Sequence, residues 1–382
     1  MLFVGVFFFF ITFYRLSLFY PSFYLACIPA FFGMLLFFNS LRTRIIFSKK
    51  SIKIFALFTL LFLYCGVLDY FQNNISLEAS FSFRILLICI LSFFPAYFLQ
   101  VLFVRDDVSN LNKIIKYAFI LQTLIFIIMF INPSLKIFLY TIFGLKDSVN
   151  LSGQNLLTRG FGLSSEINFM SPFLMVYISF LVLKRDLLLK IIIFLTQLIN
   201  SNMVLIAGGL GLLFGGANAS LKLLSFFLVI ILYYIVGEVV IQEYLPRFYD
   251  EYLAGGGGRT VSALLSEHMF AVQKIDLFSF LFGFQENVSS SVVTHGRFSD
   301  IGWVIMFNYG GVFLIFLFLL ILFVLSASIF KNKIYIMLWF LIGVLFNTKG
   351  MIIGMNGFFF LSFLLLLSKK YSGKGIAEYV HK

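Results

Sequence analysis

Continuous apolar runs rich in Phe, Leu and Ile follow one another along almost the whole chain, separated by short polar or basic turns. Runs without polar alternation are typical of membrane-spanning helices, whereas the strands of a membrane barrel alternate apolar and polar residues. A backbone inside lipid must satisfy its own hydrogen bonds, which leaves only helices or closed barrels. The pattern therefore predicts an all-α integral membrane protein that forms one polytopic domain over residues 1–382.

The runs predict about twelve transmembrane helices, each near the roughly 20 residues that cross a hydrocarbon core. The first run is short for a span, and the run that follows the longest polar loop is itself the longest. In chain order the expected spans are Leu2–Tyr14, Leu16–Phe38, Ile54–Phe71, Arg84–Val104, Tyr117–Ile131, Phe169–Leu183, Ile191–Asn200, Met203–Phe214, Leu223–Ile241, Ile301–Phe330, Ile334–Phe346 and Met351–Leu367.

Composition supports the same class, because 61% of the residues are hydrophobic and only 12% are charged. Soluble domains average about 25% charged residues. The net charge of +12 arises largely from basic clusters in alternate turns, which is the positive-inside pattern. A nucleic-acid-binding protein would concentrate these charges on one face or tail, so nucleic acid is not an expected partner. This assignment places both termini in the cytoplasm and two large polar loops, Asn132–Asn168 and Gln242–Asp300, outside.

Neither a metal nor a cofactor is expected. The three cysteines, Cys27, Cys65 and Cys89, lie within apolar runs and are expected to be small core residues. The outer loops hold no cysteine and no close cluster of His and Asp, which argues against zinc and Mg²⁺. The chain begins with apolar residues and has no small-residue cleavage site, so no cleavable signal peptide is expected.

The first outer loop ends in a motif that carries two opposite charges just before an expected span. The motif reads RGFGLSSE, from Arg159 to Glu166. Two interpretations fit these residues. Either the two side chains anchor the end of the helix at the membrane surface, or they form an outward-facing site. In such a site Arg159 would bind an anion while Glu166 accepts a proton or a hydroxyl hydrogen bond.

The second outer loop contains four glycines followed by Arg259 and Thr260. Apolar residues at helical spacing come next, which predicts an amphipathic helix with Thr260 as its N-cap, lying on the outer membrane surface. A guanidinium at a helix N-terminus attracts anions, and the alternative is a plain linker before that helix. The same loop carries Arg247 and Arg297 as further cationic candidates.

The long loop ends at Asp300, directly before the next expected span. Partial desolvation at a membrane interface makes a carboxylate a stronger base. Aspartate is also a favoured helix N-cap. Asp300 is therefore expected to be a proton acceptor, a helix cap or both.

These motifs resemble those of the bacterial O-antigen polymerases, within the wider group of O-antigen ligases and polymerases. The stretch Arg159–Glu166 is similar to the family's R-x-x-G-L-x-x-E entry to a span, and Gly258–Arg259 to the start of its large periplasmic loop. The stretch Phe282–Phe284, with Asp300 and the pair Gly310–Gly311, resembles its closing G-x-G … D … G-G pattern. Related ligases carry a His where this chain has Asp300, and this departure favours a polymerase.

The resemblance implies a glycosyltransferase of lipopolysaccharide biosynthesis in the bacterial inner membrane, with its outer loops in the periplasm. Its substrates would be oligosaccharide repeat units on undecaprenyl diphosphate, and Asp300 or Glu166 would accept the proton of the attacking sugar hydroxyl. Guanidinium groups suit the diphosphate because their fork matches phosphate geometry. The candidates for binding it are Arg159, Arg259, Arg297 and Arg247. Membrane lipid is an expected partner and a chain-length regulator protein is a candidate one.

Two other functions fit the same sequence. An O-antigen ligase would use the same donor with a lipid A core acceptor, and a flippase would transport the lipid-linked sugar without chemistry. A flippase should carry its ionisable groups inside the helix bundle, along the transport pathway. Here the expected spans are nearly free of charge and the polar groups collect in two outer loops. That distribution favours the enzyme.

Overall fold

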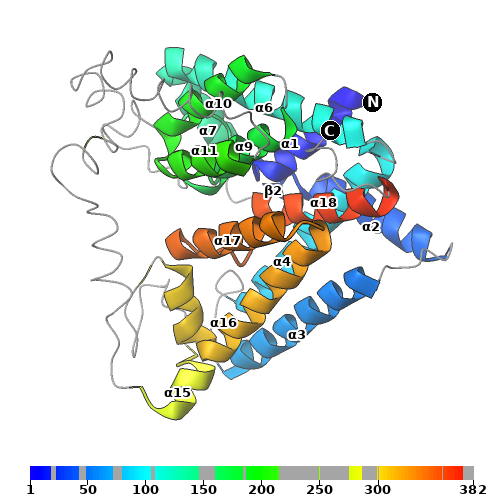
Figure 1. Ribbon diagram of the computed structural model, residues 1–382, viewed down its shortest axis with the longest axis vertical. Coiled ribbons are helices and arrows are strands. Elements are labelled where there is room, and N and C mark those ends of the chain that lie inside the picture. The colour runs from blue at the N-terminus through cyan, green and yellow to red at the C-terminus, as the bar shows by residue number, and fades with distance from the viewer. Residues whose placement is uncertain are drawn as a thin grey trace. The chain divides into compact units, whose positions relative to one another are not determined.

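The computed structural model describes residues 1–18, 23–42, 49–71, 80–104, 108–145, 160–183, 186–214, 249, 275–285, 299, 301–354 and 356–372 (Figure 1). About 82% of this described part is helical. The strands found in it are β1 (Ser17–Leu18) and β2 (Phe23–Tyr24), which pair as one antiparallel hairpin. The predicted all-α class is therefore confirmed for the described residues.

The helices follow the apolar runs in chain order. The first half of the chain contains α1 (Leu2–Phe13), α2 (Cys27–Arg42), α3 (Lys49–Phe71), α4 (Phe81–Ile88), the π-helical turn η1 (Cys89–Phe93), α5 (Phe94–Leu99), a second π-helical turn η2 (Gln100–Val104), α6 (Val108–Ile131), α7 (Pro133–Ile142) and α9 (Met170–Val182). The later described helices are α10 (Leu187–Asn200), α11 (Met203–Phe214), α15 (Leu277–Phe282), α16 (Gly302–Ile329), α17 (Lys333–Lys349) and α18 (Gly357–Ser372).

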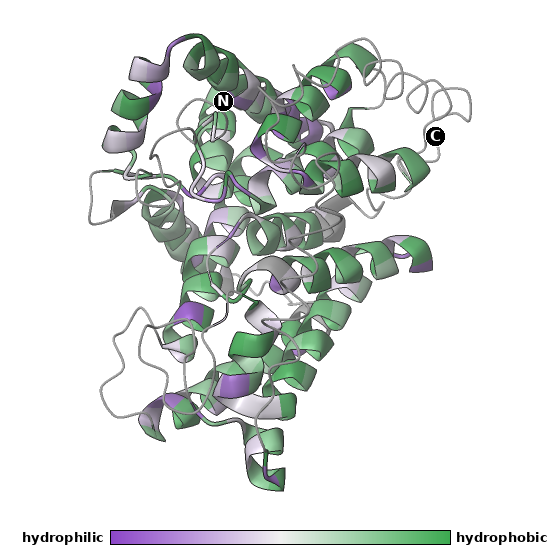
Figure 2. Cartoon of the chain, turned by 90° about the vertical axis from the view of Figure 1, so that its left-hand side faces the viewer, coloured by the Kyte–Doolittle hydropathy of each residue, from purple (hydrophilic) through white to green (hydrophobic). Residues whose placement is uncertain are grey.

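Apolar residues dominate most of these helices, and hydrophilic residues lie at several of their ends (Figure 2). Shorter apolar helices of 10–17 residues accompany four stretches that are long and apolar enough to cross a membrane. Those four stretches of the described chain are Ile52–Phe71, Phe81–Val104, Ser109–Ile131 and Gly302–Ile329. Such a set of helices is typical of an integral membrane protein, as the sequence predicted.

Two observed boundaries differ from the expected ones, and local capping explains the second. The run expected as a span from Leu16 begins instead with the β1–β2 hairpin, and its helix starts at Cys27. The segment expected as the first outer loop contains α7, because the Asn132 side chain accepts a hydrogen bond from the backbone N–H of Leu135 at 3.1 Å. Pro133 then supplies a helical φ in the first turn. The expected span Leu223–Ile241 and the amphipathic helix expected from Thr260 lie outside the described residues.

The chain divides into two compact units. Unit 1 comprises residues 1–31, 98–258 and 378–382, and unit 2 comprises residues 32–97 and 259–377. In unit 1, α9 packs against α10, α11 and α6, and every residue from Met170 to Leu181 is buried. A helix that is apolar and buried on all sides belongs to the interior of its bundle. α9 is accordingly the central helix of unit 1.

Unit 2 is built around α16, which contacts α3, α15, α17 and α18. A sharp bend at Gly311, with φ 64° and ψ −164°, divides α16 into the helices 302–310 and 312–329. The rings of Trp303 and Phe318 lie 6.1 Å apart, whereas a straight α-helix would separate these positions by about 22 Å along its axis. The first part therefore folds back along the second, as the ribbon in Figure 1 shows. The prediction of one continuous span over Ile301–Phe330 was wrong.

Candidate functional site

The site begins with a buried stretch of irregular backbone between α7 and α9, at the motif that the sequence singled out. In α10, the Asn200 side-chain oxygen accepts hydrogen bonds from the N–H groups of Gly160 at 3.1 Å and Phe161 at 2.9 Å. Its amide donates to the Phe161 carbonyl at 2.8 Å. In α6, the Gln122 side chain makes the corresponding pair of bonds to Leu163, at 3.2 Å and 3.3 Å. Two amide side chains thus replace the partners that helix or sheet would provide.

A third helix completes this clamp. The Tyr140 hydroxyl, on α7, is within hydrogen-bonding distance of the carbonyl oxygens of Gly160 and Gly162, the latter at 2.9 Å. Burial raises the pKa of Tyr140 far above its usual value, so its hydroxyl stays protonated and remains a donor. Irregular backbone at membrane depth is tolerated only where other groups of the protein, or water in a cavity, form hydrogen bonds with its N–H and C=O groups. The side chains of Asn200, Gln122 and Tyr140 provide hydrogen-bond partners for the backbone of Gly160–Leu163 and hold it in place.

The two glycines of the motif have conformations that few other residues adopt. Gly160 has φ 76° and Gly162 has φ 103°. A Cβ added at Gly162 would also lie 2.6 Å from the Gln122 side-chain nitrogen. The glycines in RGFGLSSE therefore have a structural role, which is to let the backbone turn against the clamp. This role does not require a ligand.

Glu166 lies directly after the clamped stretch and pairs with a residue that the sequence did not single out. A terminal guanidinium nitrogen of Arg15 is 3.5 Å from a Glu166 carboxylate oxygen, with side-chain exposures of 32% and 15%. Arg15 occupies the turn between α1 and β1 with φ 54°, a strained conformation for a residue other than glycine. The neighbouring N–H of Ser165 donates to the Tyr14 carbonyl at 3.2 Å. The start of the chain is thus tied to the motif.

Further polar groups gather at this corner. Among the described residues, Arg15 Nε, the Ser165 hydroxyl and the Asn168 side-chain oxygen are buried without a hydrogen-bond partner. Native proteins pair nearly all such groups, with water or ligand where protein atoms are not in reach. The partly exposed Arg15 and Glu166 side chains are the groups of this pair that a molecule from outside could contact, and a carboxylate can accept a proton.

The other predicted site residues are not among those described. Arg159, Arg247, Arg259, Arg297 and Asp300 all lie outside the described residues, so their expected roles stay predictions. The helix that follows Asp300 begins one residue later than expected. Its N-cap is Ile301, which makes no side-chain cap hydrogen bond. Within the described ranges, no group of three His, Cys, Asp or Glu side chains is placed to hold a metal ion.

The closing glycine motif brings backbone segments of unit 2 together. A Cβ at Gly283, which has φ 75°, would lie 2.7 Å from the backbone nitrogens of Gly310 and Gly311. The N–H of Phe284 donates to the Asn308 carbonyl at 2.7 Å. Gly283 and the pair Gly310–Gly311, from the two stretches that resemble the family's pattern, are therefore in direct contact, and α15 packs on the bend of α16.

A carboxylate network in unit 2 was also missed from the sequence. Asp69, near the end of α3, accepts hydrogen bonds from the Ser80 hydroxyl at 2.7 Å and from the Ser82 N–H at 2.9 Å. Its other oxygen accepts from the Tyr309 hydroxyl, and the Tyr309 ring stacks on Phe81 with centroids 4.0 Å apart. Asp69 thus caps the start of α4 and joins it to α3 and α16. Its contacts indicate a structural role.

Comparisons with protein-family models, with curated proteins and with solved structures found no match to this chain.

Proposed function

We propose that the protein is a bacterial O-antigen polymerase, a multi-pass glycosyltransferase of the inner membrane with both termini in the cytoplasm. Its donor would be the growing glycan on undecaprenyl diphosphate, and its acceptor a new lipid-linked repeat unit. The observation that carries the proposal is the Arg15–Glu166 pair. It places a largely buried carboxylate beside a cation at the end of the motif that resembles this family.

The proposed reaction needs a base and a way to stabilise the leaving group. A hydroxyl at the non-reducing end of the new unit attacks the anomeric carbon of the growing chain. Its proton passes to a carboxylate, from Asp300 or Glu166. The bond between the anomeric carbon and the diphosphate breaks, and its electron pair leaves with undecaprenyl diphosphate. Arg159, Arg259, Arg297 and Arg247 are the candidates for neutralising that charge.

The lipopolysaccharide of a deletion strain tests this function against the two alternatives. A polymerase defect should leave core molecules that carry a single repeat unit, and re-expression of the gene should restore the ladder of long chains. Loss of all repeat units from the core would contradict the proposal. The place where the lipid-linked sugar then accumulates would separate the alternatives, since a ligase defect leaves it in the periplasm and a flippase defect in the cytoplasm.

Topology is the first prediction, because each role depends on it. The basic clusters on the opposite side motivate a periplasmic position for Asn132–Asn168 and Gln242–Asp300. Fusions made after Asp147 and after Asp276 should be active with alkaline phosphatase and silent with a reporter that works only in the cytoplasm. A fusion after Lys331, in a turn expected inside, is the control and should give the opposite pair of results. Reversal at either outer point would remove the proposed site from the periplasm.

The identity of the base is the second prediction. Asp300→Asn and Glu166→Gln each keep the size of the side chain and remove its basicity. We expect Asp300→Asn to lower the polymerisation rate by about 100- to 10,000-fold, the usual range for a general base. Both variants should be made at wild-type amounts, as checked by immunoblot, with polymer read from the lipopolysaccharide ladder. Near-normal polymer from Asp300→Asn together with a loss for Glu166→Gln would assign the base to Glu166.

A further inference from the structure

The short helix α15 exposes more apolar surface than a loop in water should. Its sequence is LFSFLF, and the residues Leu277, Phe278, Phe280 and Leu281 are between 39% and 74% exposed. None of the residues of this helix is buried. Soluble surfaces rarely gather large apolar side chains on one short element unless that element binds something. The long loop was expected to place an amphipathic helix from Thr260 on the outer membrane surface, whereas no membrane contact was expected of Leu277–Phe282.

The position of α15 is fixed by backbone contacts to α16. Gly283, just after the helix, packs against the bend at Gly310–Gly311, and the Phe284 N–H is bonded to the Asn308 carbonyl. The ring of Phe280 lies 6.0 Å from that of Phe307. The exposed apolar side chains therefore belong to a helix that is packed in a fixed position, at the Gly311 end of the 312–329 stretch.

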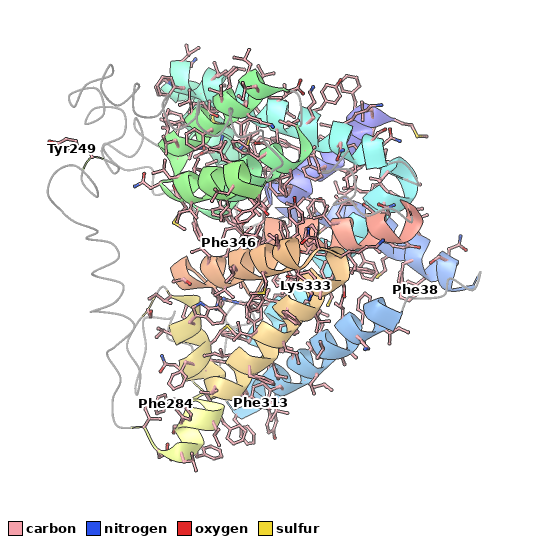
Figure 3. All side chains as sticks on the ribbon, in the orientation of Figure 1. Phe38, Tyr249, Phe284, Phe313, Lys333 and Phe346 are labelled. Carbon is pink, nitrogen blue, oxygen red and sulfur yellow. The ribbon has the colours of Figure 1, made fainter. Side chains whose placement is uncertain are left out.

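The exposed side chains of α15 continue onto the outward surfaces of two apolar helices. The ring of Phe282 lies 6.4 Å from that of Phe313 of α16, and the Phe313 ring lies 4.9 Å from that of Tyr64 of α3. Figure 3 labels Phe313 on α16. Further along these helices, Val67 and Phe316 are also exposed. Most of α3 and the 312–329 part of α16 lie within two of the stretches that are apolar enough to cross a membrane. An apolar surface on a spanning helix faces lipid, and the same surface extends over α15.

The residue that caps the start of α15 is charged, in contrast to the apolar residues of the helix. Asp276 caps the helix by accepting a hydrogen bond from the Ser279 N–H at 3.0 Å, and its carboxyl group is exposed. Hydrogen bonds from the side chain and the backbone of Ser279 hold the pKa of Asp276 below its usual range, so it carries a negative charge at neutral pH. A charged cap followed by an apolar helix is the arrangement of a segment that enters a membrane from its polar surface.

We propose that α15 is an anchor that inserts into the outer layer of the bilayer and binds the acyl chains of phospholipids. The anchor brings the Leu277–Phe282 segment of the long loop to the membrane beside the bend of α16. It leaves Asp276 in the headgroup layer and buries Phe278 and Leu281 in lipid. The proposal stands on the apolar surface and the seating of α15, and it holds whatever reaction the protein catalyses.

Depth-dependent quenching tests the anchor. Cys27, Cys65 and Cys89 are replaced by alanine, and a fluorescent label is attached at Phe278→Cys in the full chain, reconstituted into phosphatidylglycerol–phosphatidylethanolamine vesicles. Val67→Cys on α3 is the lipid-facing control, and Lys331→Cys in the turn before α17 is the water-facing control. Phospholipids brominated on their acyl chains should quench the label at position 278 as strongly as at 67. Iodide present on both sides of the vesicle membrane should quench it only at 331.

Two outcomes would overturn the anchor. Quenching of position 278 by iodide, as at position 331, would place α15 in water, and protection from both quenchers would mean that protein covers it. If the alanine background does not fold, a photoreactive diazirine residue at position 278 of the natural chain gives the same decision. Crosslinks to phospholipid are expected there, whereas crosslinks to protein alone, or none, contradict the proposal.

Discussion

Arg159→Ala and Arg259→Ala should each lower the rate of polymerisation by about 30- to 1,000-fold, which corresponds to about 2–4 kcal/mol of lost transition-state stabilisation. A diphosphate leaving group gains charge as the glycosidic bond breaks, so a cation near it lowers the barrier more than it strengthens substrate binding. Lysine at either position should restore only part of the rate, because it supplies charge without the bidentate fork.

The measurement is polymer length against time on lipopolysaccharide gels, with protein amounts matched by immunoblot. Arg42→Ala changes an arginine in an expected cytoplasmic turn and should leave the ladder unchanged. If both outer-loop alanine variants make full-length polymer at wild-type rates, the diphosphate is bound elsewhere. Arg247 and Arg297 would then be tested in the same way.

Gly311→Ala should strongly destabilise unit 2. Its backbone angles of φ 64° and ψ −164° belong to a region that is almost exclusive to glycine. A Cβ there would also lie 2.4 Å from the carbonyl carbon of Leu281, so α15 would have to move away from the bend of α16. The backbone strain alone costs about 1–3 kcal/mol, and the displaced contacts add to it. We expect a lower midpoint of thermal unfolding in detergent and little monodisperse protein.

Gly66→Ala on α3 is the matched control for this experiment. A Cβ at that position meets no atom within 4 Å, and the residue lies within a regular helix. Alanine at such a site should leave the unfolding midpoint unchanged or raise it, because it favours helix by about 0.5–1 kcal/mol. Equal stability of the two variants would contradict the close packing of α15 on the bend.

The sequence located most helices because length and hydropathy are local properties. The expected runs Phe169–Leu183 and Met203–Phe214 correspond closely to α9 and α11. The bend in α16 was missed because the apolar run is continuous there, and only the pair Gly310–Gly311 marks it. A glycine pair inside an apolar run more often permits close helix packing than a reversal.

The candidate site was harder to foresee because its contacts join distant parts of the chain. Glu166 was named from its motif, but its pairing with Arg15 depends on where the α1–β1 turn lies. Asn200 was expected as the end of the span Ile191–Asn200, whereas it is buried and hydrogen-bonds the motif backbone. An amide within an apolar run, such as Gln122 in Tyr117–Ile131, is a local signal for such a clamp, since a polar group inside a bundle must find a partner.

The fold-back of α16 also bears on how well this helix matches a bilayer. A straight helix from Gly302 to Ile329 would be about 42 Å long at 1.5 Å per residue. It would exceed a hydrocarbon core of about 30 Å. The 312–329 stretch alone rises about 27 Å, which is close to that thickness. The bend therefore removes a hydrophobic mismatch that would otherwise have to be relieved by tilting the helix or by thickening the surrounding lipid.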